Sequence, residues 1–259
     1  MTLSIAQDLL GLASGGLVGF TLGCFGGGGS ILAVPLMVYL VRVPDPHVAI
    51  GTSALAVSAN AATNLLSHAR SGTVKWRCGA VFALAGVLGA AVGSTVGKGV
   101  DGHRLLALFA GLMLAVAVLM VRTRSGEGDP AATLNRRNAP RLAAIGSMTG
   151  ALSGFFGIGG GFLIVPGLMV SARMPILFAV SSSLISVAAF GLTTALNYAL
   201  AGWVDWELAA LFLAGGAAGG FVGARLTQVI SLRSGRLNLV FAGLIVLVAG
   251  WILFRSFDR

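Results

Sequence analysis

Long apolar runs separated by short polar stretches recur along almost the whole chain. Ten such runs can be distinguished, and several reach the roughly 20 residues that a helix needs to cross the hydrocarbon core of a bilayer. The runs cover residues 5–22, 30–41, 48–67, 76–96, 105–121, 142–156, 162–170, 176–200, 208–229 and 237–254. The pattern therefore predicts an all-α polytopic membrane protein embedded in a lipid bilayer.

The apolar runs form two sets of five on either side of one polar stretch. This stretch, residues 122–141 (RTRSGEGDPAATLNRRNAPR), is rich in charge, Gly and Pro, as a linker would be. We therefore expect a first membrane repeat at 1–121, a linker at 122–141 and a second membrane repeat at 142–259.

Internal similarity relates the two sets. GFTLGCFGGGGSILAVP (19–35) aligns with GALSGFFGIGGGFLIVP (150–166), and the same register pairs Pro44 with Pro175. Further along, GTVKW (72–76) aligns with GWVDW (202–206), and glycines 86, 89 and 93 align with 216, 219 and 223. We interpret this similarity as an internal duplication, and residues that it pairs are called equivalent.

The distribution of charge indicates how the two copies are oriented. Five segments per copy, or three crossings plus a re-entrant pair, both invert the second copy, and 12 of the 17 basic residues then fall on the linker side. Four crossings per copy would make the copies parallel and would divide the basic residues 10 to 7 between the two sides, which is a weaker bias. The positive-inside rule therefore favours two inverted-topology repeats, with a cytoplasmic linker and both termini outside.

The amino-acid composition excludes several classes of protein. A chain with 56% hydrophobic residues, 10% charged residues and a mean hydropathy of +0.94 is not a water-soluble domain. The net charge of +9 arises from short basic clusters without interleaved aromatics, so we expect no nucleic-acid partner. Cys24 and Cys78 lack metal-ligand spacing, and there is no phosphate loop, nucleophile motif or acid/base pair. We therefore expect no enzyme activity, no cofactor and no metal.

The N-terminal run lacks a basic region, so we expect it to be a membrane helix and not a cleaved signal peptide.

Two of the apolar runs are too short to span a membrane. Residues 30–41 and 162–170 each follow a glycine cluster and are expected to be half-helices. Irregular backbone at membrane depth is tolerated where it lines an interior site. Its uncovered amides and the positive ends of two half-helices favour an anion. The alternative is that the glycines only allow close helix packing, which we favour for the flanking glycines at 19, 23, 150 and 154.

Polar side chains at helical spacing in the third and eighth runs point to the same interior site. They are hydrogen-bond donors that carry no charge, and the alternative is that they only join helices. With the glycine clusters they form the predicted substrate site: Gly27, Gly28, Gly29, Ser30, Thr52, Ser53, Asn60, Asn64, Gly159, Gly160, Gly161, Ser182, Ser183 and Asn197.

Ionisable side chains are scarce within the apolar runs. All eight carboxylates fall at the ends of runs or in loops, so no carboxylate relay crosses the membrane. His68 is the one ionisable side chain expected near a polar stripe. It is a candidate proton carrier, and the alternative is an interfacial histidine near Arg70.

The duplicated GxxxGxFGxGGGxLxVP pattern, AIGTS at 49–53 and SGTVKW at 71–76 resemble the sulfite exporter TauE/SafE family. The resemblance extends over almost the whole chain. It implies transport of small sulfur-containing anions, such as sulfite or organosulfonates, across the bacterial inner (plasma) membrane. The second copy has AVSSS at 179–183 in place of AIGTS, and an acidic loop after Gly202. The two halves therefore need not contribute equally.

We thus expect a transporter that binds a small anion at the membrane midplane between its repeats. Export or facilitated passage is favoured, because a potential negative inside drives an anion outward by about 2.3 kcal/mol per charge per 100 mV. An ion-coupled uptake permease, an anion channel and a non-transporting membrane subunit are the alternatives. A homodimer is compatible with the sequence.

Overall fold

The computed structural model describes residues 5–122, 129, 133–159, 161–230, 243, 246–248, 250 and 251. Throughout these residues the regular structure is helical and includes no strand. The first repeat contains α1 (Ile5–Phe25), a 3₁₀ segment (Gly26–Leu32), α2 (Ala33–Pro35), a π-helical segment (Leu36–Leu40), α3 (Pro46–Arg70), α4 (Trp76–Gly97) and α5 (Gly102–Arg122). The second contains α6 (Ala139–Phe156), α7 (Gly161–Ala172), α8 (Ile176–Ala199) and α9 (Trp206–Ile230). Most of the predicted tenth segment, 237–254, lies outside the described residues.

Local sequence signals explain several helix ends. Asp45 is the N-cap of α3, where its carboxylate accepts a 2.8 Å hydrogen bond from the N–H of His47, and Pro46 occupies the first turn. Helix α6 likewise has a proline in its first turn, and it ends at Gly157, whose φ of 68° is the left-handed conformation typical of a helix C-terminus.

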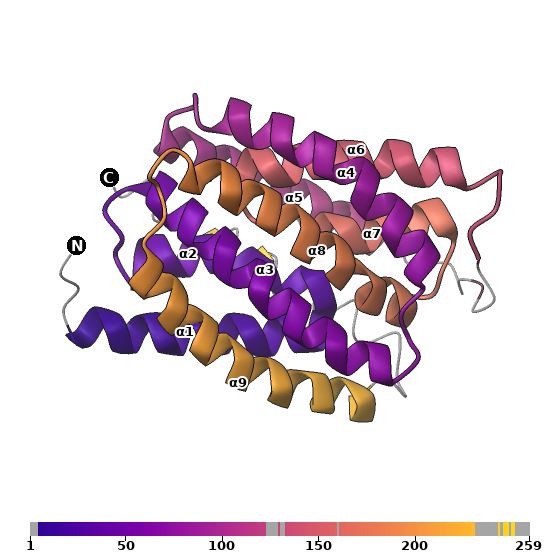
Figure 1. The fold of residues 1–259 in the computed structure, drawn as a ribbon, viewed down its shortest axis with the longest axis horizontal. Coiled ribbons are helices and arrows are strands. Elements are labelled where there is room, and N and C mark those ends of the chain that lie inside the picture. The colour runs from indigo at the N-terminus through magenta and orange to yellow at the C-terminus, as the bar shows by residue number, and fades with distance from the viewer. Residues whose placement is uncertain are drawn as a thin grey trace.

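The helices lie side by side in a layered bundle (Figure 1). One end of the bundle, here called the linker end, carries residues 71–75, 129, 133–138 and 173–175, and the opposite end carries 41–45, 98–101 and 200–205. Helices α3 and α8 occupy the middle and run antiparallel: Thr52 near the start of α3 contacts Asp205 beyond the end of α8, and Thr73 beyond the end of α3 contacts Ser181.

Glycines allow two outer helix pairs to pack at backbone distance. Helix α1 packs on α9, and α4 packs on α6. A Cβ atom at Gly19 would overlap the backbone of Gly216, and a Cβ atom at Gly150 would overlap the backbone of Gly86. These two contacts are related by the sequence duplication, since Gly19 pairs with Gly150 and Gly86 with Gly216. The first helix of each repeat therefore packs on the fourth helix of the other repeat.

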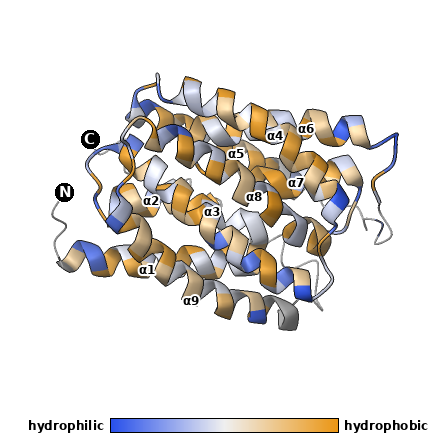
Figure 2. Cartoon of the chain, in the orientation of Figure 1, coloured by the Kyte–Doolittle hydropathy of each residue, from blue (hydrophilic) through white to orange (hydrophobic). Residues whose placement is uncertain are grey.

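Four helical stretches among the described residues are long and apolar enough to cross a membrane: Ala6–Leu40, Trp76–Gly97, Ile176–Ala199 and Trp206–Leu226. Large apolar side chains such as Leu84 and Leu88 on α4 are more than 70% exposed, which suits contact with lipid. Figure 2 shows that the helices are mainly apolar and that polar residues gather toward the two ends of the bundle. The expectation of a helical membrane protein is confirmed.

Helix α3 is long enough to span but is not one of those four stretches. Its polar residues lower its hydropathy, and more than half of its residues are buried by its neighbours. A helix surrounded by protein does not need an apolar surface on every side. Its central position explains why a helix with this composition lies in an apolar bundle.

Candidate functional site

The two glycine clusters meet in the interior of the bundle. The N–H of Gly27 donates a 3.0 Å hydrogen bond to Oγ of Ser183 on α8, and Oγ of Ser30 donates one of 2.9 Å to the carbonyl of Gly27. Gly161, at the start of α7, lies so close that a Cβ atom there would overlap the carbonyl oxygen of Gly27. The break in the first repeat therefore lies directly against the break in the second.

Backbone conformation requires glycine at the first position of each break. Gly26 and Gly157 are equivalent residues of the two repeats, and their φ angles are 58° and 68°. A side chain at Gly26 would meet Val180 of α8, and one at Gly157 would meet Ile50 of α3. Val180 and Ile50 are themselves equivalent, as the second residues of AVSSS and AIGTS. Each break thus turns sharply against the central helix of the other repeat.

The breaks differ after this shared first residue. Residues 26–40 continue without interruption as 3₁₀, α and π turns, whereas residues 157–159 form a turn before the 12-residue helix α7. Gly159 has a φ of 65° and faces Val57 and Val187. Gly28 and Gly29 are buried, and the carbonyl of Gly29 accepts a hydrogen bond from Thr21. Gly160 lies outside the described residues.

Fully buried hydroxyls of Ser30 and Ser183 lie at the meeting point, since both bond to Gly27. The side chains of Ser30, Ser53 and Ser183 have no exposed surface. Ser53 donates to the carbonyl of Ile50 at 3.1 Å, and Ser183 donates to that of Val180 at 2.7 Å, so the two equivalent serines bond back to their own helices in the same way. The environment is polar but uncharged. An oxyanion there would be held by amide and hydroxyl dipoles.

Thr52 and Ser182 are fully buried, and the structure shows that they hold loops. Oγ1 of Thr52 accepts a 2.9 Å hydrogen bond from the N–H of Asp205, and Oγ of Ser182 accepts one of 2.8 Å from the N–H of Lys75. Each hydroxyl therefore fixes the turn that follows the central helix of the other repeat. This stabilising contact is a role that the sequence did not indicate.

Asn60 and Asn64 face α9 and not the glycine clusters. A Cβ atom at Gly216 would overlap the amide of Asn60, and one at Gly220 would meet the amide of Asn64. Nδ2 of Asn64 donates to the carbonyl of Asn60 at 2.9 Å, whereas both amide atoms of Asn60 are buried without a partner in the described structure. The pair lies along the same helix as Ser53 but at the α9 interface.

Asn197 lies near the end of α8 that is opposite the linker. Its amide bonds to Ser94, Thr95 and Lys98 of the α4 terminus at 2.7–2.9 Å. Measured along the helix, it lies about 21 Å beyond Ser183. The polar stripe of α8 therefore extends beyond the region of the glycine clusters, and Asn197 joins two helices there.

His68 belongs to a polar group near the linker end. Its Nδ1 lies 3.1 Å from Oγ of Ser181, which lies 2.8 Å from Oγ1 of Thr73. The histidine is only 5% exposed, and its Nε2 is buried. Ser181 was not among the predicted site residues, although its place directly before Ser182 was a usable signal. No group of three or more metal-ligating side chains occurs among the described residues.

Two helix breaks that meet at a buried, uncharged polar site inside an apolar helical bundle are typical of a membrane transport protein. The sequence model of the family described as sulfite exporter TauE/SafE matches residues 11–252. The chain therefore belongs to this family of membrane transporters and is not an enzyme.

Several relatives are named as probable membrane transporter proteins. One from Xylella fastidiosa strain 9a5c is 49% identical over 257 residues, covering 98% of each chain. YdhB from Bacillus subtilis is 28% identical over 217 residues, covering 83% of this chain and 88% of that protein. One from Methanocaldococcus jannaschii is 30% identical over 187 residues, covering 69% and 67%. No solved structure matches the chain.

Proposed function

We propose that the chain carries small sulfur-containing oxyanions, such as sulfite or organosulfonates, across the bacterial inner membrane. The observation that carries the proposal is the contact of Gly27 with Gly161 and Ser183 inside the bundle. Glycine has no side chain to cover the backbone amides there. The family description supplies the substrate class.

The proposed binding mode uses donors that are now bonded within the protein. The Gly27 amide and the Ser183 hydroxyl bond to each other, and Ser30 bonds to the Gly27 carbonyl. A small outward movement of one break would turn these groups toward an oxyanion. The start of α7 adds a partial positive charge of about half an elementary charge. Because every donor is neutral, the anion is not trapped by a full opposite charge.

We further propose that the two repeats are inverted relative to each other. The antiparallel arrangement of α3 and α8 supports this, since a two-fold axis in the membrane plane relates equivalent helices in that way. The reciprocal bonds of Thr52 with Asp205 and of Ser182 with Lys75 support it as well. In this topology the linker faces the cytoplasm and the start of α1 faces outside.

Export or facilitated passage is the favoured direction. The membrane potential alone drives an anion outward, and the buried polar residues of the described structure include no carboxylate to carry a coupling cation. Coupled uptake is the second candidate, because His68 is a titratable side chain buried in the bundle beside Ser181.

Ligand-dependent stabilisation of the purified protein tests the proposal. Sulfite, methanesulfonate, sulfate and acetate are added separately, and the unfolding temperature is recorded for each. An anion present at 100 times its dissociation constant stabilises the folded state by about 2.7 kcal/mol. We expect stabilisation by sulfite or methanesulfonate, and a reduced effect in Ser183→Ala. If all four anions act equally, or none acts, a specific sulfur-oxyanion site is contradicted.

A further inference from the structure

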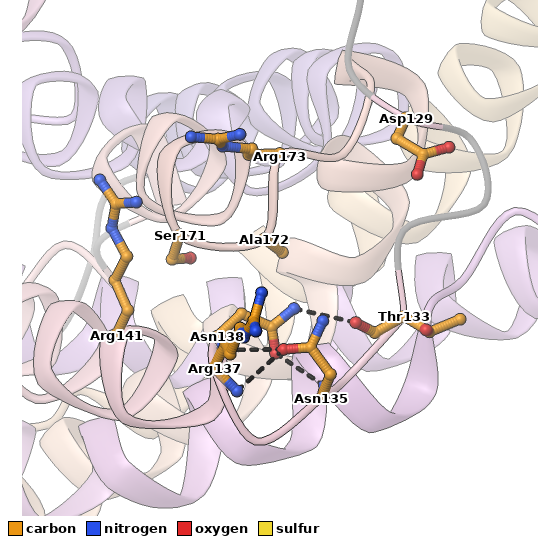
Figure 3. A pocket seen from close by; sticks show the side chains of 9 residues that line it. All are labelled: Asp129, Thr133, Asn135, Arg137, Asn138, Arg141, Ser171, Ala172 and Arg173. Carbon is orange, nitrogen blue, oxygen red and sulfur yellow. Dashed lines mark hydrogen bonds between the residues drawn. The ribbon is translucent and has the colours of Figure 1, made fainter.

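A polar cavity lies at the linker end of the bundle, away from the glycine clusters. It has a volume of about 550 Å³ and opens between the start of α6 and the end of α7. Three arginines line it, together with polar side chains from the linker and from α7 (Figure 3). The groups that matter most are Arg137, Arg141, Arg173, Asn138 and Ser171.

The arginines of this cavity are available to a ligand. Among the described residues, no hydrogen bond or ion pair involves the guanidinium groups of Arg137, Arg141 or Arg173. Among the described lining residues Asp129 is the one carboxylate, and its N–H donates to the carbonyl of Arg173 at 2.8 Å. The three arginines and this carboxylate give the described lining a formal charge of +2.

The loop that carries one of these arginines is held in place. Asn135 and Asn138 exchange two hydrogen bonds, each from a backbone N–H to the other's side-chain oxygen, both at 2.8 Å. Nδ2 of Asn138 also donates to the carbonyl of Thr133 at 2.9 Å. These bonds, drawn in Figure 3, fix the turn that positions Arg137 at the cavity. Such preorganisation lowers the entropy cost of binding.

The first repeat contains the equivalent cavity, with a different lining. It has a volume of about 470 Å³ and lies at the opposite end of the bundle. Arg42 and Arg173 are equivalent, and both have a positive φ, of 61° and 54°. Where the second repeat has Arg141 and Ser171, the first has Leu10 and Leu40. Since the fold forms both cavities, it does not require the cationic lining of the second.

The positive-inside rule explains why arginines are numerous at the linker end, but it does not require them to converge. Arg136 contributes to the same charge bias and is exposed next to Arg137, yet it does not line the cavity. The presence of three arginines in the lining of one concave site needs a separate explanation, and a bound oxyanion supplies one.

We propose that this cavity binds the transported oxyanion before it enters the central site. This role rests on the proposed function. Guanidinium groups bind sulfonate- or phosphate-type oxygens through paired, charge-assisted hydrogen bonds. Helix α7 connects the two places, because Ser171 near its end lines the cavity and Gly161 at its start touches Gly27. Its 12 residues correspond to a path of about 18 Å.

The test compares Arg141→Leu, which copies Leu10 of the first repeat, with Arg136→Leu, which removes the same charge from outside the cavity. Methanesulfonate flux is measured in proteoliposomes. The orientation of the protein in them is determined from the accessibility of the linker to protease. We expect Arg141→Leu to raise the half-saturating methanesulfonate concentration on the linker side about tenfold, the loss of one charge-assisted hydrogen bond. We expect the maximal rate of Arg141→Leu to equal that of the wild type. We expect Arg136→Leu to equal the wild type in both the half-saturating concentration and the maximal rate.

Equal half-saturation in both variants and the wild type would overturn the proposal while leaving the proposed function intact. If the wild type carries no methanesulfonate, the proposed function fails, and calorimetric binding of methanesulfonate to wild type but not Arg141→Leu would still establish the anion site.

Comparison of phosphatidylcholine vesicles with and without phosphatidylglycerol distinguishes a lipid headgroup from a free anion. If the Arg141→Leu effect occurs only with phosphatidylglycerol, the cavity binds lipid and the substrate role is wrong. If it occurs in phosphatidylcholine alone, the cavity acts on the free anion.

Discussion

Oγ1 of Thr52 accepts a 2.9 Å hydrogen bond from the backbone N–H of Asp205, which links the central helix of the first repeat to the turn after the central helix of the second. The duplication repeats this bond between Ser182 and Lys75 at 2.8 Å. In both cases a buried hydroxyl oxygen accepts a hydrogen bond from a backbone N–H of the turn. The two bonds fix α3 and α8 relative to each other at both ends.

Removing either hydroxyl is expected to destabilise the protein. Thr52→Val and Ser182→Ala each leave a backbone N–H without its acceptor, which costs about 1–3 kcal/mol of unfolding free energy. Thr52→Ser keeps the acceptor and should recover most of the loss. The measurement is unfolding in detergent, with Thr193→Val as the control, because the Thr193 hydroxyl bonds only to the carbonyl of Ala189 in its own helix. A control as unstable as Thr52→Val would show that the loop contact is unimportant.

The contact between the two breaks leads to a second prediction. Gly161→Ala forces a methyl group onto the carbonyl of Gly27 and should destabilise the protein by about 1–3 kcal/mol through overpacking. Gly111→Ala in α5 meets nothing within 4 Å. It should stabilise the helix by about 0.5–1 kcal/mol. The unfolding temperatures of both variants are compared with that of the wild type. An unaffected Gly161→Ala variant would mean that the breaks are not in contact.

The Ser183 hydroxyl is expected to matter for anion affinity. Ser183→Ala removes the partner of the Gly27 amide, and we expect methanesulfonate affinity to fall about tenfold, equivalent to about 1.4 kcal/mol. Ser94→Ala is the matched control, because Ser94 is also fully buried but belongs to the Asn197 cluster. Calorimetric titration of both variants gives the comparison. An equal loss in the two variants would point to a general effect on the fold.

Topology can be tested by cysteine labelling. Cys24 and Cys78 are buried and form no disulfide, and they are replaced by alanine to give a background without thiols. Single cysteines at Arg136 in the linker and at exposed Ala201 in the loop before Asp205 should then react from opposite sides of the membrane. Labelling of both from one side would make the two repeats parallel.

Apolar patterning was sufficient to predict most helices. The expected segments 76–96 and 176–200 correspond to Trp76–Gly97 and Ile176–Ala199, and the glycine clusters mark the breaks. These features are local, because they depend on hydrophobic length and on the backbone freedom of glycine.

The partners of individual polar residues were not predictable in the same way. Helical spacing placed Ser53 and Asn60 on one face of α3, but it does not identify the helix that each part of that face contacts. Asn60 meets Gly216 of α9, whereas Asn197 reaches Lys98 of α4. The cavity around Arg141 and Arg173 was also missed, because it forms only when the linker turn packs beside the end of α7.

The most direct test of the account is methanesulfonate flux in proteoliposomes with an imposed membrane potential and no ion gradient. An inside-positive potential should drive accumulation of the anion, and Ser183→Ala should reduce it at subsaturating concentration. His68→Gln should leave this flux unchanged if no proton is coupled. Accumulation that begins only when a proton or Na⁺ gradient is added would contradict export by facilitated passage, and the absence of flux under every condition would contradict oxyanion transport itself.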